Sequence, residues 1–312
     1  MTLRSYSTPL AFKQSLEQRL RSDSGSGPAL ARRRQLLIFD RFLARVVHTL
    51  GDAATLKGGL VLELRLSRAR TTRDIDLRLT GSSARVLERL QQAARLDLDD
   101  WLSFEVGRDD EHPDIQSDAM QYEGMRFRVE CRLAGKRYGQ RFGVDVAFGD
   151  PIVGEPERVT AQDLLAFVGV PPPTLRLYPV ETHIAEKLHA YTMPRSRPNS
   201  RVKDLPDIAL LATTGQLHAE RLAEALKQTF SFRKTHALPT TLPAPISSWQ
   251  APYEAMARAD TLQWPTLAEL TTAASSFLDP ILAGERQARW QPEDWRWRDW
   301  QPRAALPGPG RT

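Results

Sequence analysis

The segment RTTRDIDLRL, residues 70 to 79, carries most of the information about fold and site. Within it, the apolar residues of IDLRL alternate with polar ones, which predicts a strand with one buried face. Side chains at i and i+2 on a strand project from the same face, so Asp74 and Asp76 form a carboxylate pair. Such a pair can chelate a divalent cation, but the same pattern is also common on solvated strand faces.

A third carboxylate follows in GQRFGVDVAFGD, residues 139 to 150. Its apolar residues share one face, so Asp145 lies on the opposite face, and a neighbouring strand would bring it to the first two acids. Three adjacent carboxylates repel one another unless a cation neutralises them. The preceding segment MRFRVECRL, residues 125 to 133, alternates in the same way and predicts another strand joined to this one by a turn at AGKR.

Helical patterns flank these strands on both sides. We expect two helices within residues 8 to 50, an apolar helix after the glycine pair at 58 and 59, and a further helix over 83 to 96. A proline-rich stretch, residues 150 to 179, is typical of a boundary between lobes, and the chain beyond it is mainly helical. The predicted division is therefore an N-terminal lobe of residues 1–155 and a helical lobe of residues 156–312.

Composition narrows the class of protein. A chain of 312 residues suggests two lobes, and 41% hydrophobic residues suffice for a sizeable core. The net charge of +5 mildly favours a polyanionic partner without requiring one. A single cysteine, Cys131, excludes a disulfide framework and a cysteine-rich zinc site. No apolar leader and no long apolar run are present, so we expect a cytoplasmic protein without membrane contact.

Five motifs, taken in order, resemble the AbiEii/MenT type of nucleotidyltransferase toxin, a family of the DNA polymerase β-like superfamily. They are LKGG at 56 to 59, RTTRDIDL at 70 to 77, GVDVAFGD at 143 to 150, AEKLHA at 185 to 190 and KDLPDIALL at 203 to 211. The resemblance implies an α+β, bilobed protein with a mixed-sheet nucleotidyltransferase lobe and a helical C-terminal lobe. It also implies transfer of a nucleotide from an NTP to the 3′ end of tRNA, which blocks translation, and control by a cognate antitoxin.

The resemblance assigns a metal site in the first lobe. Asp74 and Asp76 match the pair that binds Mg²⁺ or Mn²⁺, and Asp145 matches the third carboxylate, which joins the metal site and orients or deprotonates the attacking hydroxyl. Thr72 matches the small hydroxyl residue before the acids. The glycine pair Gly58-Gly59 replaces the Gly-Ser pair that is usual in the superfamily, and is expected near the nucleotide.

In the second lobe the resemblance assigns Lys187 to the triphosphate and either Asp204 or Asp207 to a further acidic position. From the residues alone, a solvated helical lysine is the commoner outcome for Lys187, and only the resemblance makes a functional role equally plausible. The two aspartates and the proline between them also make a good helix start, with Asp204 as the N-cap.

Two further features have alternative interpretations. Arg195, Arg197 and Arg201, in the loop at 193 to 203, could hold RNA phosphates or simply make the surface soluble. The tryptophans between 290 and 300 could stack on bases, although docking of the C-terminal segment onto the helical lobe is favoured. Two other functions stay open: transfer to a hydroxyl of a protein or small molecule, and an inactive binding protein of the same fold.

Overall fold

The computed structural model describes residues 5–66, 72–109, 124–195 and 201–300. The chain forms two compact units, Met1–Pro179 and Val180–Thr312. We describe each unit by itself.

The N-terminal unit is built on one mixed sheet of eight strands, in the order β3-β4-β6-β2-β1-β8-β7, with β5 paired to β4. The strands β2 and β6 are parallel, as are β1 and β8, and the other pairs are antiparallel. The strands are β1 (Ala54–Lys57), β2 (Ile75–Leu79), β3 (Leu102–Arg108), β4 (Gly124–Leu133), β5 (Lys136–Arg137), β6 (Phe142–Phe148), β7 (Glu157–Thr160) and β8 (Thr174–Leu177).

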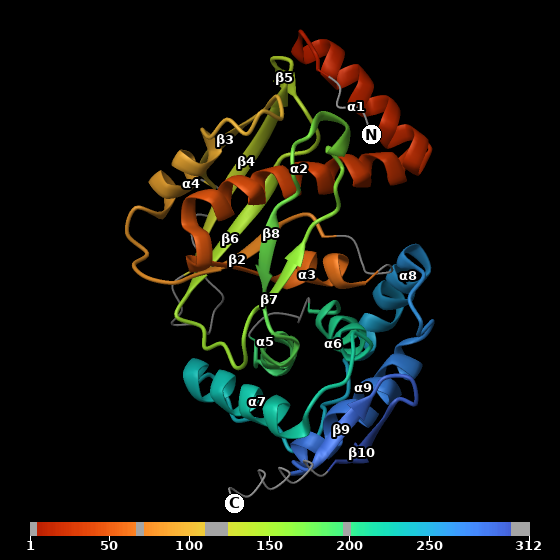
Figure 1. Cartoon of the computed structure of the whole chain (residues 1–312). Helices are drawn as coiled ribbons and strands as arrows, with labels where there is room; N and C mark the ends of the chain where they lie inside the picture. The colour runs from red at the N-terminus through yellow and green to blue at the C-terminus, as the bar shows by residue number, and fades with distance from the viewer. Residues whose placement is uncertain (1–4, 67–71, 110–123, 196–200, 301–312) are drawn as a thin grey trace, which may run out of the picture. The chain divides into compact units, whose positions relative to one another are not determined.

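Helices cover the apolar face of this sheet. They are α1 (Pro9–Ser24), α2 (Pro28–Leu50), α3 (Gly58–Arg65) and α4 (Val86–Ala94), with short 3-10 turns η1 (Gly51–Ala53) and η2 (Ala166–Val168). Figure 1 shows α2 crossing the strands, and the rings of Phe39 and Phe42 on α2 pack against Phe142 of β6 at centroid distances of 4.9 and 5.6 Å. The Thr8 hydroxyl accepts a hydrogen bond from the N–H of Ala11 and so fixes the start of α1.

A buried ion cluster joins α2 to the segment before β3. Asp100 accepts hydrogen bonds from both Arg41 and Arg45, and the Arg45 and Asp100 side chains are completely buried. The two guanidinium groups lower the pKa of Asp100, although its burial opposes them. The pairing satisfies charges that would otherwise be costly to bury.

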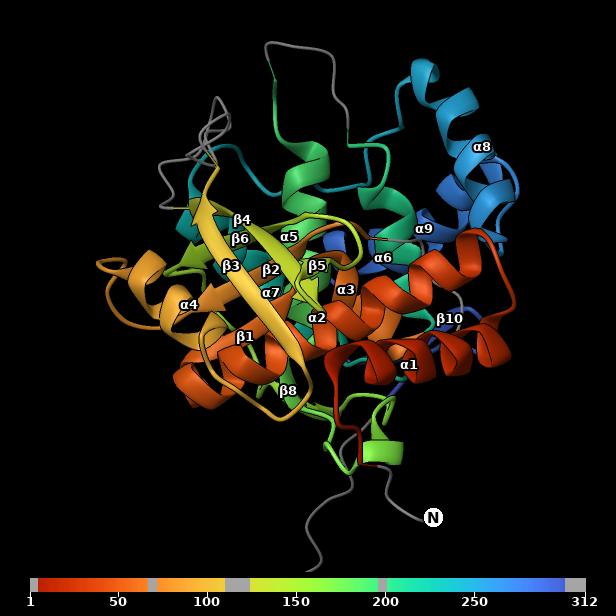
Figure 2. The same cartoon turned by 90° about the horizontal axis from the view of Figure 1, so that it is seen from above.

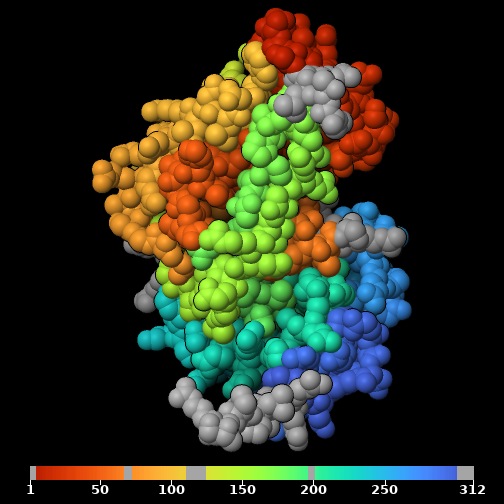
Figure 3. All heavy atoms as spheres, in the orientation of Figure 1, coloured from red at the N-terminus to blue at the C-terminus, as the bar shows by residue number. Residues whose placement is uncertain are grey.

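The α+β class with a mixed sheet is confirmed, and β2, β4 and β6 lie where alternation predicts strands. The expected boundary at 155/156 is wrong, because β7 and β8 follow it and still belong to the N-terminal sheet. In Figure 3 the light-green surface of this segment lies alongside the orange surface of α2, and the unit ends at Pro179. The two short strands β7 and β8 were not predicted because they lie in proline-rich sequence.

The C-terminal unit consists mainly of helices with one two-stranded sheet. Its elements are α5 (Val180–Thr192), α6 (Asp204–Ala212), α7 (Ala219–Arg233), η3 (Ser247–Trp249), α8 (Gln250–Asp260), α9 (Leu267–Leu282), β9 (Ala288–Gln291) and β10 (Arg296–Asp299). A capping box formed by Thr266 and Glu269 begins α9. Among the helices in the described ranges, none is long and apolar enough to cross a membrane.

The tryptophans of the C-terminal segment dock onto this unit. The indole N–H groups of Trp295 and Trp297 donate to the carbonyls of Ala273 and Phe277 on α9, at 3.0 and 2.7 Å. Trp290 is fully buried and donates to the carbonyl of Ala212. These three rings are therefore packing residues of the unit, as the docking interpretation predicts.

Candidate active site

The strands β2 and β6 bring two of the predicted acids together. They run parallel and in a register that sets Asp76 directly beside Asp145. Their chain neighbours Ile75 and Val144 are fully buried, whereas both aspartates are only partly buried, so the two carboxylates share the polar face of the sheet. Neighbouring strands lie about 4.8 Å apart, so the pair is adjacent by construction of the sheet.

Arg126 on β4 holds Asp145 from the other side. Its Nε and Nη2 atoms donate to Oδ1 and Oδ2 of Asp145, both at 2.6 Å. The guanidinium and the carboxylate are 34% and 15% exposed, and the pairing raises the pKa of Arg126. The negative charge of the neighbouring carboxylates is therefore compensated in part by the guanidinium group of Arg126. Alternation in MRFRVECRL places Arg126 on the polar face, but only the strand register shows that it faces Asp145.

Asp74 lies just before β2, over a glycine of the neighbouring strand. Its Oδ1 accepts a hydrogen bond from the N–H of Gly143 at 3.0 Å. A Cβ atom at position 143 would lie 2.8 Å from that oxygen, so any larger residue would displace the carboxylate. The glycine in FGVDV therefore fits the position of Asp74.

Gly58 makes room for the carboxylate of Asp76. It has φ +69°, and a Cβ there would lie 2.0 Å from Oδ2 of Asp76. No side chain fits that space, and positive φ itself favours glycine. Gly59 is buried in the first turn of α3. The glycine pair thus lets the start of a helix approach the second aspartate of D-x-D, where the helix dipole favours negative charge.

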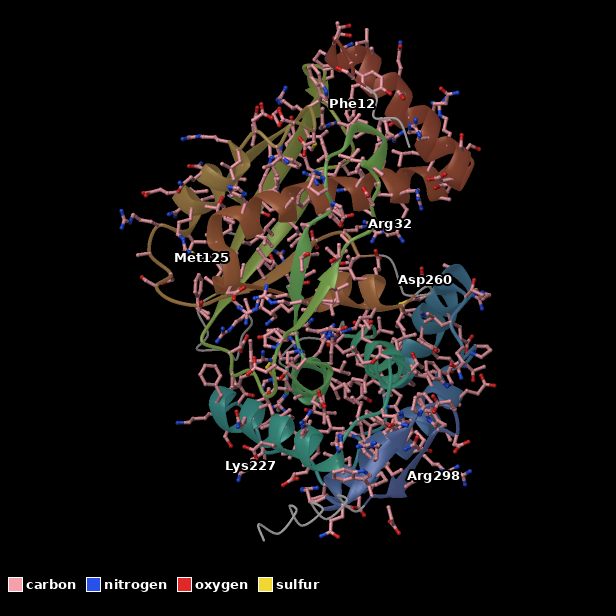
Figure 4. All side chains as sticks on the ribbon, viewed as in Figure 1. Phe12, Arg32, Met125, Lys227, Asp260 and Arg298 are labelled. Carbon is pink, nitrogen blue, oxygen red and sulfur yellow. The ribbon has the colours of Figure 1, made fainter. Side chains whose placement is uncertain are left out.

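Thr72 is held by a network that sequence reasoning did not identify. Glu63 of α3 accepts a hydrogen bond from the backbone N–H of Thr72 at 2.7 Å, and Arg32 of α2 donates to its carbonyl at 2.6 Å. Arg32 also forms an ion pair with Glu63. Arg32, labelled in Figure 4, has a pKa lowered to about 10 by burial. These bonds fix the backbone two residues before Asp74.

Lys57 is a second cation, after Arg126, beside the two in-register aspartates. These side chains form a row across the sheet, called here the carboxylate row. The lysine of LKGG lies on β1 opposite Asp76, is 8% exposed, and its Nζ is 3.0 Å from Oδ2 of Asp150. Asp150 is almost fully buried after β6. Across four adjacent strands the polar face therefore carries Lys57, Asp76, Asp145 and Arg126 in that order. Both Lys57 and Asp150 lie within the recognised motifs, but neither was assigned a role.

The donor chemistry of this row fits a hard divalent cation. Mg²⁺ and Mn²⁺ prefer carboxylate oxygens, and Asp76 and Asp145 place such oxygens side by side with Asp74 next to them. Within the described ranges there is no ready-made group of three or more acidic, histidine or cysteine ligands. Arg126 engages both oxygens of Asp145, so a cation would have to compete with it.

The C-terminal unit contains a separate buried charge cluster on α5 and α6. The Nζ of Lys187 lies 2.8 Å from Oδ2 of Asp207 and 3.2 Å from Oδ1 of Asp204. The lysine side chain is 14% exposed, and Asp207 is completely buried. Lys187 is therefore not the solvated helical lysine that its sequence position also allowed. Both aspartates of the KDLPD motif contact it directly.

The helix-start interpretation of these acids needs correction. Lys203 is the N-cap of α6, has helical dihedral angles and makes no side-chain capping bond, so Asp204 is the first helical residue. Arg201 lies 3.6 Å from Asp204, and Arg195 donates to the carbonyl of Ala190 at 3.5 Å. Arg197 lies outside the described residues. The predicted RNA-binding loop thus has both of its described arginines in contact with its own unit.

Comparison with known proteins identifies the family. The profile of the family described as "Nucleotidyl transferase AbiEii toxin, Type IV TA system" matches residues 41–297, which is most of the chain. No curated protein matches the sequence.

Three solved structures are similar at low identity. JHP933 from Helicobacter pylori is 16% identical, with a TM-score of 0.42, over 80% of this chain and 93% of that chain. MenT4, a nucleotidyltransferase toxin from Mycobacterium tuberculosis, is 14% identical, with a TM-score of 0.49, over 86% and 94%. A putative nucleotidyltransferase from H. pylori is 16% identical, with a TM-score of 0.43, over 80% and 95%. On the profile match, the chain belongs to the AbiEii family of nucleotidyltransferase toxins.

Proposed function

We propose that the protein is a toxin that transfers one or more nucleotides from an NTP to the 3′ end of tRNA, with the help of Mg²⁺ or Mn²⁺, and so blocks translation. The observation that carries this proposal is the register of Asp76 beside Asp145 on parallel strands, with Gly58 leaving room for the first carboxylate. Membership of the family supports nucleotidyl transfer as the reaction class.

The proposed reaction is a substitution at the α-phosphorus of the NTP. The 3′ hydroxyl oxygen of the acceptor forms a bond to that phosphorus, the bond to the bridging oxygen breaks, and pyrophosphate leaves with the bonding electrons. The hydroxyl proton goes to a carboxylate or to water. Such a reaction depends mainly on positioning and on compensation of phosphate charge.

Three carboxylates have distinct parts in this proposal. Asp74 and Asp76, together with Asp145, would hold the divalent cation, which when bound neutralises phosphate charge. Asp145 would also orient the acceptor hydroxyl and accept its proton. Arg126 now restrains that carboxylate with two hydrogen bonds, and it would have to release at least one oxygen for proton transfer.

The role proposed for Lys187 is contact with the triphosphate. An ammonium group between two aspartates is held in one place at little further entropic cost, so Asp204 and Asp207 would act as positioning residues for it. Lys57 offers an alternative phosphate contact in the unit that carries the carboxylate row.

The partners in this proposal are an NTP, the acceptor end of tRNA and a cognate antitoxin protein. The family description includes a toxin-antitoxin system, which supports the antitoxin. Both substrates are cytoplasmic, so we propose that the toxin acts there.

The test supplies purified full-length protein and Mg²⁺ with each α-labelled NTP in turn. Acceptors are intact tRNA, tRNA whose 3′ ribose has been oxidised with periodate, and a pool of cell proteins. We expect label in intact tRNA alone. Equal labelling of oxidised tRNA would rule out 3′ extension, and label confined to protein would assign the enzyme to hydroxyl groups of proteins instead.

A further inference from the structure

A shallow groove with a volume of about 420 Å³ lies on the polar side of β3 and β4, within the N-terminal unit. Figure 2 shows these two strands, in yellow and yellow-green, at one edge of the sheet. The groove is rich in arginine, and its lining residues are Glu105, Val106, Gly107, Arg108, Arg128, Glu130 and Arg141.

The strand register places two glycines between this groove and the candidate carboxylates, and the path over them is called here the lane. Arg128 of β4 lies between Gly107 of β3 and Gly143 of β6, so neither neighbour puts a side chain beside it. Among the residues that the structure describes, none would lie within 4 Å of a Cβ at Gly107. On the other side of Arg128, the backbone N–H of Gly143 donates a hydrogen bond to the carboxylate of Asp74. The lane therefore leads from the groove to the first acid of D-x-D.

The arginines of the groove are exposed and paired with carboxylates. Arg128 lies 2.9 Å from Asp109, and Arg141 lies 2.6 Å from Glu130, with arginine side chains 41% and 56% exposed. The hydrogen bond from Arg141 lowers the pKa of Glu130. Both carboxylates are only 10% exposed, but each guanidinium carries five N–H donors and is itself partly exposed, so a phosphate can approach the guanidinium groups from the solvent. The planar guanidinium donates two parallel hydrogen bonds to a phosphate, as it does to a carboxylate.

Distance along the sheet suits a chain that ends at Asp145. Arg128 lies one strand across and two residues along from Asp145, because it is in register with Gly143, and Arg141 comes four residues before Asp145. With strands about 4.8 Å apart and a rise of about 3.3 Å per residue, the two arginines are roughly 8 and 13 Å from Asp145 along the sheet. An acceptor chain that ends at Asp145 would thus bring its last phosphodiester groups over Arg128 and then over Arg141. The loop at 193 to 203, in contrast, has both of its described arginines in contact with its own unit.

We propose that this groove binds the phosphodiester backbone next to the 3′ end of the RNA acceptor, with Arg128 and Arg141 as its principal phosphate contacts. The inference rests on the proposed function for the identity of the acceptor. The ligand is a single-stranded RNA end. The lane lies on one face of the sheet, and the contacts that it offers are to phosphates and not to base edges.

The experiment measures binding of a short, fluorescently labelled single-stranded RNA to the full-length chain over a range of salt concentrations. The test variant combines Arg128→Gln with Arg141→Gln. The control combines Arg158→Gln with Arg296→Gln, which removes the same charge from two exposed, ion-paired arginines elsewhere. Each phosphate contact contributes about 0.7 to the slope of log K against log salt for single strands, so the test variant should lose about 1.4. We expect its affinity at low salt to fall about tenfold and the control to stay near wild type.

Several results would overturn the proposal: an unchanged slope in the test variant, an equal loss in the control, or no RNA binding by the wild type. Displacement of the RNA by poly-glutamate at equal charge concentration would assign the groove to an acidic protein instead. Transfer of label from NTP is followed in parallel. Arginine-dependent binding without any transfer by the wild type would refute the proposed function and leave the groove intact. Normal transfer, with RNA binding that does not depend on either arginine, would refute the groove proposal and leave the proposed function intact.

Discussion

Arg126 and Asp145 form a two-fold hydrogen-bonded ion pair, with both nitrogen–oxygen distances at 2.6 Å. Asp145 is also the carboxylate that lies in register with Asp76. A cation that binds the acids must therefore compete with a guanidinium for Asp145. If the acids bind metal as proposed, Arg126 is therefore expected to weaken that binding.

Replacing Arg126 should strengthen metal binding. The Arg126→Gln variant removes charge-assisted hydrogen bonds worth about 1.5 to 3 kcal/mol in proteins, and frees both oxygens of Asp145. We expect Mn²⁺, followed by electron paramagnetic resonance, to bind about tenfold more tightly. Arg132→Gln is the matched control, because Arg132 lies on the same strand and pairs with Glu105 and Glu130. Unchanged or weaker Mn²⁺ binding in Arg126→Gln would contradict competition for Asp145.

The Gly58→Ala substitution should disrupt the site beyond the cost of its dihedral angle. The new Cβ would lie 2.0 Å from Oδ2 of Asp76, so the carboxylate or the start of α3 must move. Gly135→Ala is the control, because Gly135 has φ +73° and no described residue would lie within 4 Å of a Cβ there. We expect urea denaturation to show a loss of unfolding free energy about 1 to 3 kcal/mol greater for Gly58→Ala than for the control. Equal losses would mean that the contact with Asp76 does not constrain position 58.

Removal of Lys187 should destabilise the protein. Lys187→Met leaves Asp204 and Asp207 without their ammonium partner, and breaking a buried ion pair typically costs about 3 to 5 kcal/mol. Urea denaturation followed through the C-terminal tryptophans should report that loss. Adding Asp207→Leu should recover part of the stability, because it removes the buried charge as well. A Lys187→Met protein as stable as wild type would show that the cluster is not a structural requirement.

Asp40 should make stability depend on pH. It is buried on α2, and burial raises its pKa to about 7. The folded protein therefore holds this proton over a range where the unfolded chain has lost it. The contribution is complete below the unfolded pKa, declines as pH rises towards 7, and is lost above it, at up to about 1.4 kcal/mol per pH unit.

The measurement compares the unfolding free energy of Asp40→Asn and wild type from pH 4 to pH 8. We expect the variant to gain stability relative to wild type as pH rises. Asp163→Asn, at an exposed position in the same unit, is the control and should follow wild type. A constant difference between Asp40→Asn and wild type across that range would show that Asp40 does not titrate there.

The strands predicted from the sequence alternate apolar and polar residues, but β3, which alternates buried and exposed residues over Leu102–Val106, was not predicted. β2 and β6 alternate buried and partly buried residues at their first five positions, and this is the pattern that sequence analysis detects. β1 is buried at all four positions, so it has no alternation and reads as the start of the helix that follows. β7 and β8 are four residues long and lie in proline-rich sequence, which is typical of a linker.

The candidate site shows a similar limit. Alternation placed Asp76 and Asp145 on polar strand faces, and the resemblance paired them, as the register now does. The cations beside them, Lys57 and Arg126, were not assigned because their roles depend on which strands are neighbours. Arg32 and Glu63 meet at Thr72 from two different helices, and no spacing in the sequence predicts that contact.

Incorporation of label from an α-labelled NTP into tRNA by the Asp76→Asn and Asp145→Asn variants tests whether the in-register pair is catalytic. Each removes a charge from the in-register pair and keeps the side-chain size, and Asp97→Asn controls for loss of an exposed carboxylate. We expect either site variant to lower the rate at least a hundredfold at unchanged thermal stability, with the control at the wild-type rate. Incorporation at the wild-type rate by both site variants would show that the pair is not catalytic.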